Sequence, residues 1–105
     1  MFREALKGHL DLLLLAVLER GPAHGYAVIE SLRTHSGGAF DLPEGTVYPA
    51  LHRLEKDGLL SSHWSEDSGR RRRVYQLTPK GVEALSRRRA EWGQFSSAVD
   101  ATLEI

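Results

Sequence analysis

Residues 45–58, GTVYPALHRLEKDG, decide the fold of this 105-residue chain. The apolar positions of this stretch recur at the spacing of one helical face, which predicts a helix that packs inward. They are Val47, Ala50, Leu51 and Leu54. Gly58 suits the left-handed backbone position that follows a helix end. The opposite face carries side chains that can form hydrogen bonds: Thr46, Tyr48, His52, Arg53 and Lys56. A helix with such a face can enter the major groove of DNA, where polar side chains contact base edges.

The start of this helix depends on how Pro49 is accommodated. A helix that begins at Pro43 would lose an internal hydrogen bond at Pro49 and bend there. A helix whose regular part begins near Thr46 would hold Pro49 in its first turn, where a missing N–H costs little. Both starts fit the sequence.

Two apolar segments upstream predict two more helices. Residues 10–20 place Leu10, Leu13, Leu14, Val17 and Leu18 on one face and Leu12, Leu15 and Ala16 on another, and Gly21-Pro22 ends the segment. A helix that is apolar on two sides needs two partners, so in a short chain we expect the second to be another subunit. Residues 24–35 carry a single stripe of Gly25, Val28, Ile29 and Leu32, and Ser36-Gly37-Gly38 follows.

A β-hairpin is predicted after the third helix. Residues 60–65 and 72–77 alternate between two faces, and Glu66-Asp67-Ser68-Gly69 is the predicted turn. We expect Trp64 to lie in the core beside Leu60, on the same strand face. Gly69 and four consecutive arginines, Arg70, Arg71, Arg72 and Arg73, lie at the tip. Adjacent guanidinium groups suit phosphates or the minor groove, and a solvated hairpin tip is the alternative.

A long helix is predicted to end the chain. Thr78 is a favoured N-cap and Pro79 a favoured first residue, and the helix runs to about Leu103, about 37 Å at 1.5 Å per residue. Its apolar residues have a heptad-like spacing that favours packing against another subunit: Val82, Leu85, Trp92, Val99 and Leu103, with Arg89 and Ser96 in the gaps. Arg87 to Arg89 are expected on a solvated face.

The order helix, helix, turn, helix, hairpin, long helix is that of a winged helix-turn-helix. We therefore expect a mainly α-helical protein with a small β-hairpin. Residues 1–78 would form the DNA-binding domain and residues 79–105 a C-terminal dimerisation helix, in one structural unit. The polar third helix and the basic hairpin, or wing, could then engage one DNA duplex together.

Composition limits the other possibilities. The chain has 14 basic and 14 acidic residues, which argues weakly against DNA binding, but screening beyond about 10 Å makes local charge density decisive. It has no cysteine, its five histidines lack metal-ligand spacing, and it has no phosphate loop or nucleophile motif. We expect no metal, cofactor or enzymatic activity. The longest apolar run, residues 12–17, is about a third of a membrane span, and no signal-peptide pattern occurs, so we expect a cytoplasmic protein without a membrane partner.

Several motifs resemble the PadR family of transcriptional regulators over nearly the whole chain. They are His24-Gly25-Tyr26, residues 45–55, Gly58-Leu59-Leu60, residues 69–72 and residues 75–81. The single helix after Thr78 is similar to that of the smaller PadR subfamily. The resemblance implies a homodimer that usually represses transcription, binds a pseudo-palindromic operator in double-stranded DNA, and is often released by a small molecule.

The resemblance also draws attention to Trp92. In a multidrug-responsive member of the family, a tryptophan at the matching place lines a pore between subunits and stacks on flat aromatic drugs. We therefore expect Trp92, its copy in the other subunit and Leu12 to form an effector site. Ser96 stands where an acidic residue would favour a cationic drug. Packing between subunits without any ligand is the alternative role of Trp92.

The sequence leaves two possible roles open for Tyr26 and for Lys56, and two possible functions for the protein. Tyr26 is either a core aromatic or a hydroxyl donor to a phosphate, and Lys56 either contacts DNA or only offsets the helix dipole. A winged-helix module that binds proteins and not DNA is the rival function. The basic wing beside a polar third helix favours DNA.

Overall fold

The computed structural model describes residues 3–67 and 69–104. In chain order the elements are α1 (Arg3–Leu6), α2 (Leu10–Glu19), β1 (Ala23–His24), α3 (Gly25–His35), α4 (Glu44–Lys56), β2 (Leu60–Asp67), β3 (Arg70–Leu77) and α5 (Pro79–Leu103). The predicted winged helix-turn-helix order with a long final helix is confirmed, and the sequence analysis missed only the short elements α1 and β1. None of the described helices is both long and apolar enough to cross a membrane.

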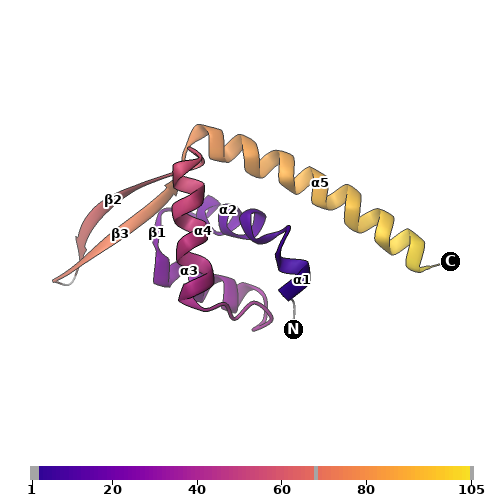
Figure 1. Cartoon of the computed structure of the whole chain (residues 1–105), viewed down its shortest axis with the longest axis horizontal. Helices are drawn as coiled ribbons and strands as arrows, with labels where there is room; N and C mark the ends of the chain where they lie inside the picture. Colours follow the sequence, from indigo (N-terminus) through magenta and orange to yellow (C-terminus); the bar gives the residue numbers. More distant parts are fainter. Residues whose placement is uncertain (1–2, 68, 105) are drawn as a thin grey trace.

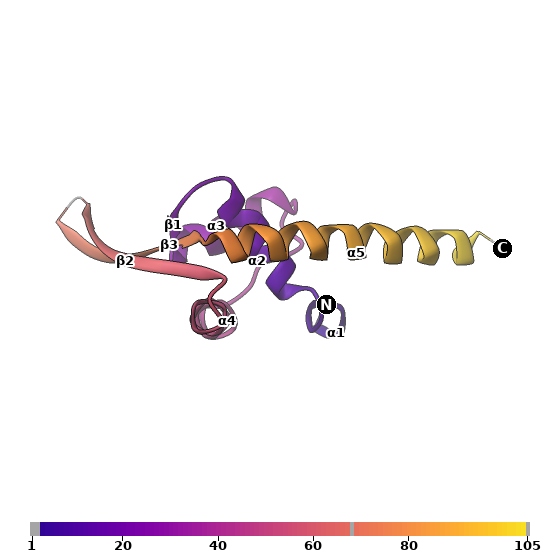
Figure 2. The ribbon, with the colours of Figure 1, turned by 90° about the horizontal axis from the view of Figure 1, so that it is seen from above.

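The molecule is elongated, with extents of 57 × 28 × 20 Å. Helices α2, α3 and α4 form its body, and the β2–β3 hairpin and α5 project from that body in opposite directions (Figures 1 and 2). Figure 2 also shows α4 set apart from the line of α5, on the side of the body where the hairpin begins. This shape leaves one face of α4 and most of the hairpin free to meet a partner.

The core is built where the predicted helical faces meet. All the apolar residues assigned to the inner face of α4 and to the stripe of α3 are buried: Val47, Ala50, Leu51, Leu54, Val28, Ile29 and Leu32. From α2, Leu14, Leu15 and Leu18 are buried, whereas the remaining apolar residues of that helix are only partly covered. Leu60, Tyr75, Ala84 and Leu85 close the core from the hairpin base and α5. Helix α2 therefore keeps a second apolar side that the described residues do not fully cover.

Helix α4 begins before its proline. The Pro43 carbonyl oxygen accepts hydrogen bonds from the backbone N–H groups of Thr46 (3.0 Å) and Val47 (3.2 Å), so the helix starts at Glu44. Pro49 therefore lies in the second turn of the helix. The observed start at Glu44 is close to the earlier of the two predicted starts, Pro43. The helix accepts this position at the loss of one backbone hydrogen bond to the Gly45 carbonyl group.

The hairpin is longer and its turn tighter than predicted. The sheet has the antiparallel order β1-β3-β2, and Asp67 pairs with Arg70 and Glu66 with Arg71. The predicted four-residue turn is therefore wrong, because Glu66 and Asp67 belong to β2 and only residues 68 and 69 connect the strands. Gly69 has φ +76°, a left-handed conformation that such a short connection requires. Ser68 lies outside the described residues.

Trp64 is not a core residue, in contrast to the prediction. Its side chain is 52% exposed, whereas Leu60 on the same strand face is buried. Four residues separate the two, about 13 Å along a strand, and over that distance the hairpin has left the body. Trp64 instead packs against two arginines of β3, Arg71 and Arg73.

The first turn of α5 is fixed to the end of α4. The Thr78 hydroxyl accepts a hydrogen bond from the Gly81 N–H (3.0 Å) and donates one to the Gly58 carbonyl oxygen (2.6 Å), which confirms the predicted N-cap. Gly81 is buried against the Leu59 carbonyl group, and a Cβ at this position would overlap the carbonyl oxygen. The orientation of α5 is thus set by backbone contacts beside the hairpin.

The outer part of α5 leaves the body with apolar residues uncovered. Of the heptad-like series, Leu85 is buried in the core, while Val82, Trp92, Val99 and Leu103 are exposed, as is Phe95. Arg87 and Arg89 are exposed, as predicted, but Arg89 also makes two hydrogen bonds to Glu19 of α2 (2.8 and 3.3 Å). Arg88 lies 3.8 Å from Asp11 of the same helix.

Candidate nucleic-acid interface

The outward face of α4 follows from its buried one. At about 100° per residue, Gly45, Pro49, His52 and Lys56 lie opposite the core residues, and all of them are exposed. Thr46 and Arg53 lie on one flank, and Tyr48 and Glu55 on the other. The five polar residues predicted on this helix therefore do not share one face, since His52 and Lys56 point outward and the others lie to the sides.

Arg53 is engaged within the protein. Its Nη1 and Nη2 atoms donate hydrogen bonds of 3.0 and 2.8 Å to the two carboxylate oxygens of Asp11, on α2. This hydrogen bond is the main cause that raises the pKa of Arg53 above its ordinary value. The side chain remains 51% exposed. Arg53 and Thr46 border a groove between α2 and α4, separate from the groove beside the wing.

The wing arginines alternate between the two faces of the hairpin. The guanidinium carbon of Arg71 lies 4.5 Å from the centre of the Trp64 ring and that of Arg73 lies 5.2 Å from it, so both stack on the indole. Arg73 also lies 3.8 Å from the Glu55 carboxylate, which itself accepts a hydrogen bond from Ser62 (2.6 Å). These contacts tie the wing to the flank of α4.

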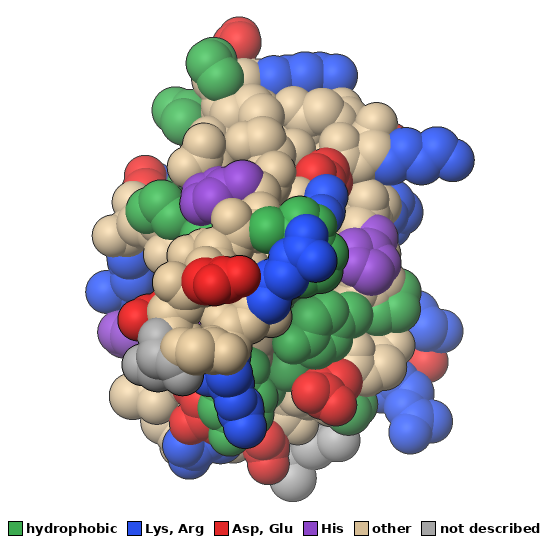
Figure 3. Space-filling view, turned by 90° about the vertical axis from the view of Figure 1, so that its left-hand side faces the viewer, with side chains coloured by type: hydrophobic (Ala, Val, Ile, Leu, Met, Phe, Trp, Pro, Cys, Tyr) green, Lys and Arg blue, Asp and Glu red, His purple; other side chains and the backbone are tan. Residues whose placement is uncertain are grey.

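Helix α4, the start of α3 and the wing enclose one open groove of about 580 Å³. Seven of the predicted site residues border it: Tyr26, Tyr48, His52, Arg70, Arg71, Arg72 and Arg73. Lys56 lies near the far end of α4 and Gly69 at the hairpin tip. Seen from the hairpin end, separate Lys and Arg side chains lie among hydrophobic and acidic ones, so the positive charge does not form a continuous sheet (Figure 3).

The two tyrosines have different settings. Tyr26 is 58% exposed, so the alternative that it is a core aromatic is wrong. Tyr48 is half-buried, and its ring lies so close to Gly25 that a Cβ there would stand 2.6 Å from the ring carbon Cζ. The glycine of the His24-Gly25-Tyr26 motif thereby lets α3 and α4 approach each other, and Tyr48 borders the groove.

His24 is a functional candidate that the sequence analysis did not assign. Its Nδ1 atom accepts a hydrogen bond from the Ala27 N–H (3.3 Å) and so caps α3, and its Nε2 atom lies 2.7 Å from Nη1 of Arg72. Burial, and then the charge of Arg72, lower the pKa of His24 below its ordinary value, against a smaller opposing effect of Asp67. Because histidine is not a preferred N-cap, no local sequence signal marked this role.

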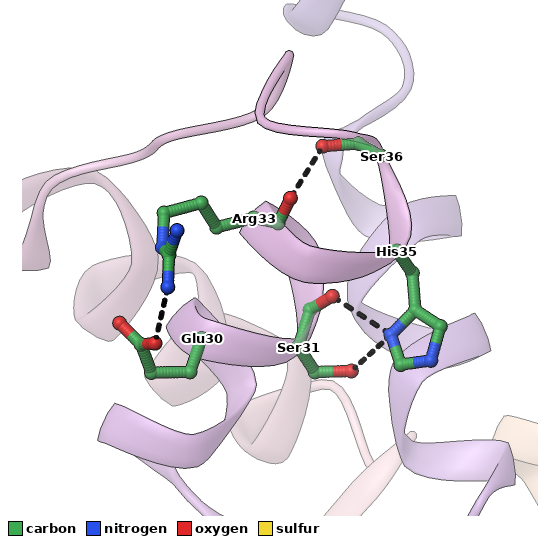
Figure 4. Close-up of polar contacts among 5 residues, drawn as sticks. All are labelled: Glu30, Ser31, Arg33, His35 and Ser36. Carbon is green, nitrogen blue, oxygen red and sulfur yellow. Dashed lines mark hydrogen bonds and ion pairs between the residues drawn. The ribbon is translucent and has the colours of Figure 1, made fainter.

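The turn between α3 and α4 is set by polar contacts at the end of α3 (Figure 4). Arg33 donates to the Glu30 carboxylate (2.8 Å), and His35 Nδ1 lies 2.9 Å from the Ser31 carbonyl oxygen. The Ser36 hydroxyl donates to the Arg33 carbonyl oxygen (3.3 Å) and accepts from the Phe40 N–H (2.8 Å). None of these residues was predicted to contact DNA; they fix where the chain leaves α3 toward α4.

The predicted effector residues are only partly brought together. Leu12 and Trp92 border one mainly apolar cavity of about 340 Å³, together with Ala5, Leu6, His9, Leu13 and Phe40. The His9 ring meets Trp92 edge to face, with 5.0 Å between ring centres. Ser96 is not part of this lining, and its hydroxyl donates to the Gly93 carbonyl oxygen of its own helix. Within the described part of the chain, no three histidine or acidic side chains converge as metal ligands.

Comparison with known proteins agrees with this architecture. The sequence model of the Transcriptional regulator PadR-like family matches residues 14–87. The protein named Transcriptional regulator Rv3488 from Mycobacterium tuberculosis is 39% identical over 84 residues, which are 80% of this chain and 76% of that protein. An uncharacterised protein from Lysinibacillus sphaericus is 26% identical over 102 residues, or 96% of this chain and 94% of its own length.

Solved structures extend the likeness to α5. A PadR family transcriptional regulator from Eggerthella lenta superposes with a TM-score of 0.85 and 36% identity, over 99% of this chain and 89% of that one. A transcriptional regulator from Clostridium thermocellum gives a TM-score of 0.85 with 28% identity, over 92% and 95% of the two chains. The family match covers the body, the wing and the first turns of α5, and the structural match covers nearly all the rest, so this chain belongs to the PadR-like family of transcriptional regulators.

Proposed function

We propose that this protein is a homodimeric repressor that binds a pseudo-palindromic operator in double-stranded DNA. Helix α4 would enter the major groove, and the wing would lie along the flanking backbone. The observation that carries the proposal is the single groove that Tyr26, Tyr48, His52 and the four wing arginines border. The groups that would face bases and those that would face phosphates thus lie together on one side of the molecule.

We infer different tasks for these groups from their positions. His52 and Lys56 lie on the outward face of α4, so they would meet base edges or the groove wall. Arg70 and Arg71 are exposed at the wing, beside the left-handed turn at Gly69, and would meet phosphates. The exposed Tyr26 hydroxyl, at the start of α3, would donate to the backbone on the other side of α4 from Arg53.

The dimer would form through α5 and the outer side of α2. Trp92, Phe95, Val99 and Leu103 are exposed apolar residues along one helix, and an apolar surface of this extent is typical of an interaction site. In this division residues 1–78 bind DNA and residues 79–105 join the subunits, with the outer side of α2 as a second contact. Two-fold symmetry would place the half-sites about one helical turn apart, near 10 base pairs.

A small aromatic effector would bind beside Trp92. The cavity that Trp92 shares with Leu12 joins α5 to α2, and α2 packs directly on α4. A ligand that binds one spacing of the two subunits better than another would shift the spacing of the two α4 helices. Weaker operator binding would follow.

The proposal is tested by fluorescence anisotropy with the duplex upstream of the protein's own gene and with a scrambled duplex, across a salt series. We expect tighter binding to the first duplex, with a steep salt dependence. Replacing Arg70–Arg73 together by glutamine should weaken binding to both duplexes and reduce the log–log salt slope by about 0.9 for each phosphate that the variant no longer neutralises. Arg87→Gln, on α5, is the control for the removal of a single positive charge away from the wing.

The rival role, a winged-helix module that binds proteins, makes the opposite prediction. It leaves the anisotropy of both duplexes unchanged even at low salt. Equal binding to the two duplexes would keep DNA as the partner and remove the operator assignment. Sedimentation of the free protein tests the homodimer separately.

A further inference from the structure

Three helices meet at the carboxylate of Asp11. Arg53 of α4 binds both of its oxygens, at 2.8 and 3.0 Å, and Nη2 of Arg88 of α5 lies 3.8 Å from Oδ2. The Asp11 side chain is only 17% exposed, whereas Arg53 is 51% and Arg88 37% exposed. One mostly buried anion thus lies beside two more exposed cations, one on the helix proposed to read DNA and one on the helix proposed to join the subunits.

We propose that Asp11 is a positioning residue that controls when Arg53 can contact a base. In the free protein Asp11 holds Arg53, and when Arg53 turns to DNA the carboxylate is taken over by Arg88. The inference rests on the proposed function, because it requires α4 to lie against DNA. It adds a residue of α2, outside the DNA-facing surface, to those that determine sequence preference.

The hydrogen-bonding capacity of Arg53 makes the two states exclusive. A guanidinium group reads guanine through two N–H groups that point at O6 and N7. The Asp11 contact already uses one N–H on each terminal nitrogen, in the same two-pronged geometry. Arg53 therefore cannot make that end-on base contact without leaving Asp11. Breaking a half-exposed ion pair lowers affinity by up to about fivefold, less than a good guanine contact adds.

Arg88 lowers the free-energy cost of moving Arg53 away from Asp11, because it can replace Arg53 as the partner of the carboxylate. A carboxylate that is mostly buried is costly to leave without a partner. The gap of 3.8 Å between Arg88 Nη2 and Asp11 Oδ2 exceeds a hydrogen bond by about 1 Å, so a small side-chain movement closes it. The Arg88 side chain is 37% exposed, which leaves it room for this movement. The two arginines can thus exchange at one anion.

The chain contains a matched control pair. Glu19 and Arg89 link the same two helices, α2 and α5, through two hydrogen bonds of 2.8 and 3.3 Å. No residue of α4 takes part in this pair. A variant of Glu19 or Arg89 therefore reports what an α2–α5 ion pair contributes by itself, without any effect on Arg53.

The test is a double-mutant cycle on the full-length protein. The probe is a duplex selected by the wild-type protein from a randomised 30-base-pair pool, compared with a scrambled duplex of the same composition. Asp11→Asn should bind the selected duplex up to about fivefold more tightly than Glu19→Gln does. Arg88→Gln should bind it about three- to fivefold more weakly than Arg89→Gln, and in the Asp11→Asn background it should change the affinity by less than about twofold.

Several outcomes would overturn the proposal while leaving the proposed function in place. Weaker binding of Asp11→Asn to both duplexes would make Asp11 a simple support. An Arg88→Gln loss that persists in the Asp11→Asn background would mean that Arg88 contacts DNA itself. Unchanged selectivity in Arg53→Gln would remove Arg53 from base reading. If the wild-type protein selects no duplex at all, the proposed function fails first. Melting temperatures of all variants identify any that lose the fold.

Discussion

His24 makes the stability of the protein depend on pH in a direction that the structure fixes. A neutral imidazole has one acceptor nitrogen, which His24 can offer either to the Ala27 N–H or to the Arg72 guanidinium. A protonated imidazole has none, and it would place a cation 2.7 Å from Arg72. Both effects agree with burial in lowering the pKa of His24 in the folded state.

The sign follows from proton linkage. Because the folded pKa of His24 lies below the unfolded one, the unfolded chain takes up the proton first as the pH falls. The stabilisation is therefore complete above the unfolded value, near pH 6.5, and it is lost as the pH falls through the folded pKa. A basic pH beyond this window should bring no further gain from His24.

The size of the effect comes from the cap. Loss of a helix N-cap costs about 1 kcal/mol, which for a chain of this length corresponds to roughly 5 °C in melting temperature. His24→Asn is the informative variant, because asparagine is a preferred N-cap whose side-chain oxygen accepts from Ala27 at every pH. We expect it to match the wild type within about 2 °C at pH 8 and to be the more stable of the two at pH 5, by up to about 5 °C.

Thermal melts followed by circular dichroism, at one protein concentration between pH 5 and pH 8, provide the measurement. The other histidines are the same in both proteins, so their contributions cancel in the difference. His24→Ala should lose stability already at pH 8, because it removes the cap without titration. Parallel curves for the wild type and His24→Asn would refute the assignment of the pH dependence to His24.

Three further predictions concern the frame of the site. Gly81→Ala should lower the free energy of unfolding in urea by about 2–3 kcal/mol, because its Cβ meets the Leu59 carbonyl oxygen, and an unchanged midpoint would contradict the docking of α5. Trp64→Leu should weaken binding to a mixed-sequence duplex about two- to fivefold by removing the ring on which two wing arginines stack, with a melting temperature within about 2 °C of wild type; a large loss of stability would restore Trp64 to the core. Trp92→Asp should give monomers in sedimentation, and a persistent dimer would place the interface elsewhere.

Local patterns predicted the helices well, because burial on one helical face repeats every three to four residues. The four inner residues of α4 are all buried, and α5 begins at Pro79 after the predicted Thr78 cap. The same reasoning missed β1, because two residues cannot show a strand period. Glu66 and Asp67 were also wrongly assigned to a turn, because their side chains are typical of turns. In the structure they lie in β2, opposite arginines of β3.

The other differences arise from tertiary contacts. Alternation in β2 indicates which side Trp64 occupies but not where the hairpin leaves the body, so the exposure of this side chain could not be predicted. The partner of Arg53 lies 42 residues away and that of Arg89 lies 70 residues away, beyond any local pattern. The five polar residues of α4 were therefore predicted on one face, whereas the structure spreads them over an outward face and two flanks and pairs Arg53 with Asp11.

The distribution of ion pairs explains how a chain without net charge can present a basic wing. Among the described residues, carboxylates on α1, α2 and α3 are paired with nearby cations, as in Glu4–Lys7, Glu30–Arg33 and Glu19–Arg89. No ion pair among the described residues involves Arg70, Arg71 or Arg72. These guanidinium groups therefore keep their charge available for phosphates. Since Glu66 and Asp67 lie directly opposite two of them, the wing alone should attract DNA only moderately, and α4 must then supply most of the affinity that distinguishes one sequence from another.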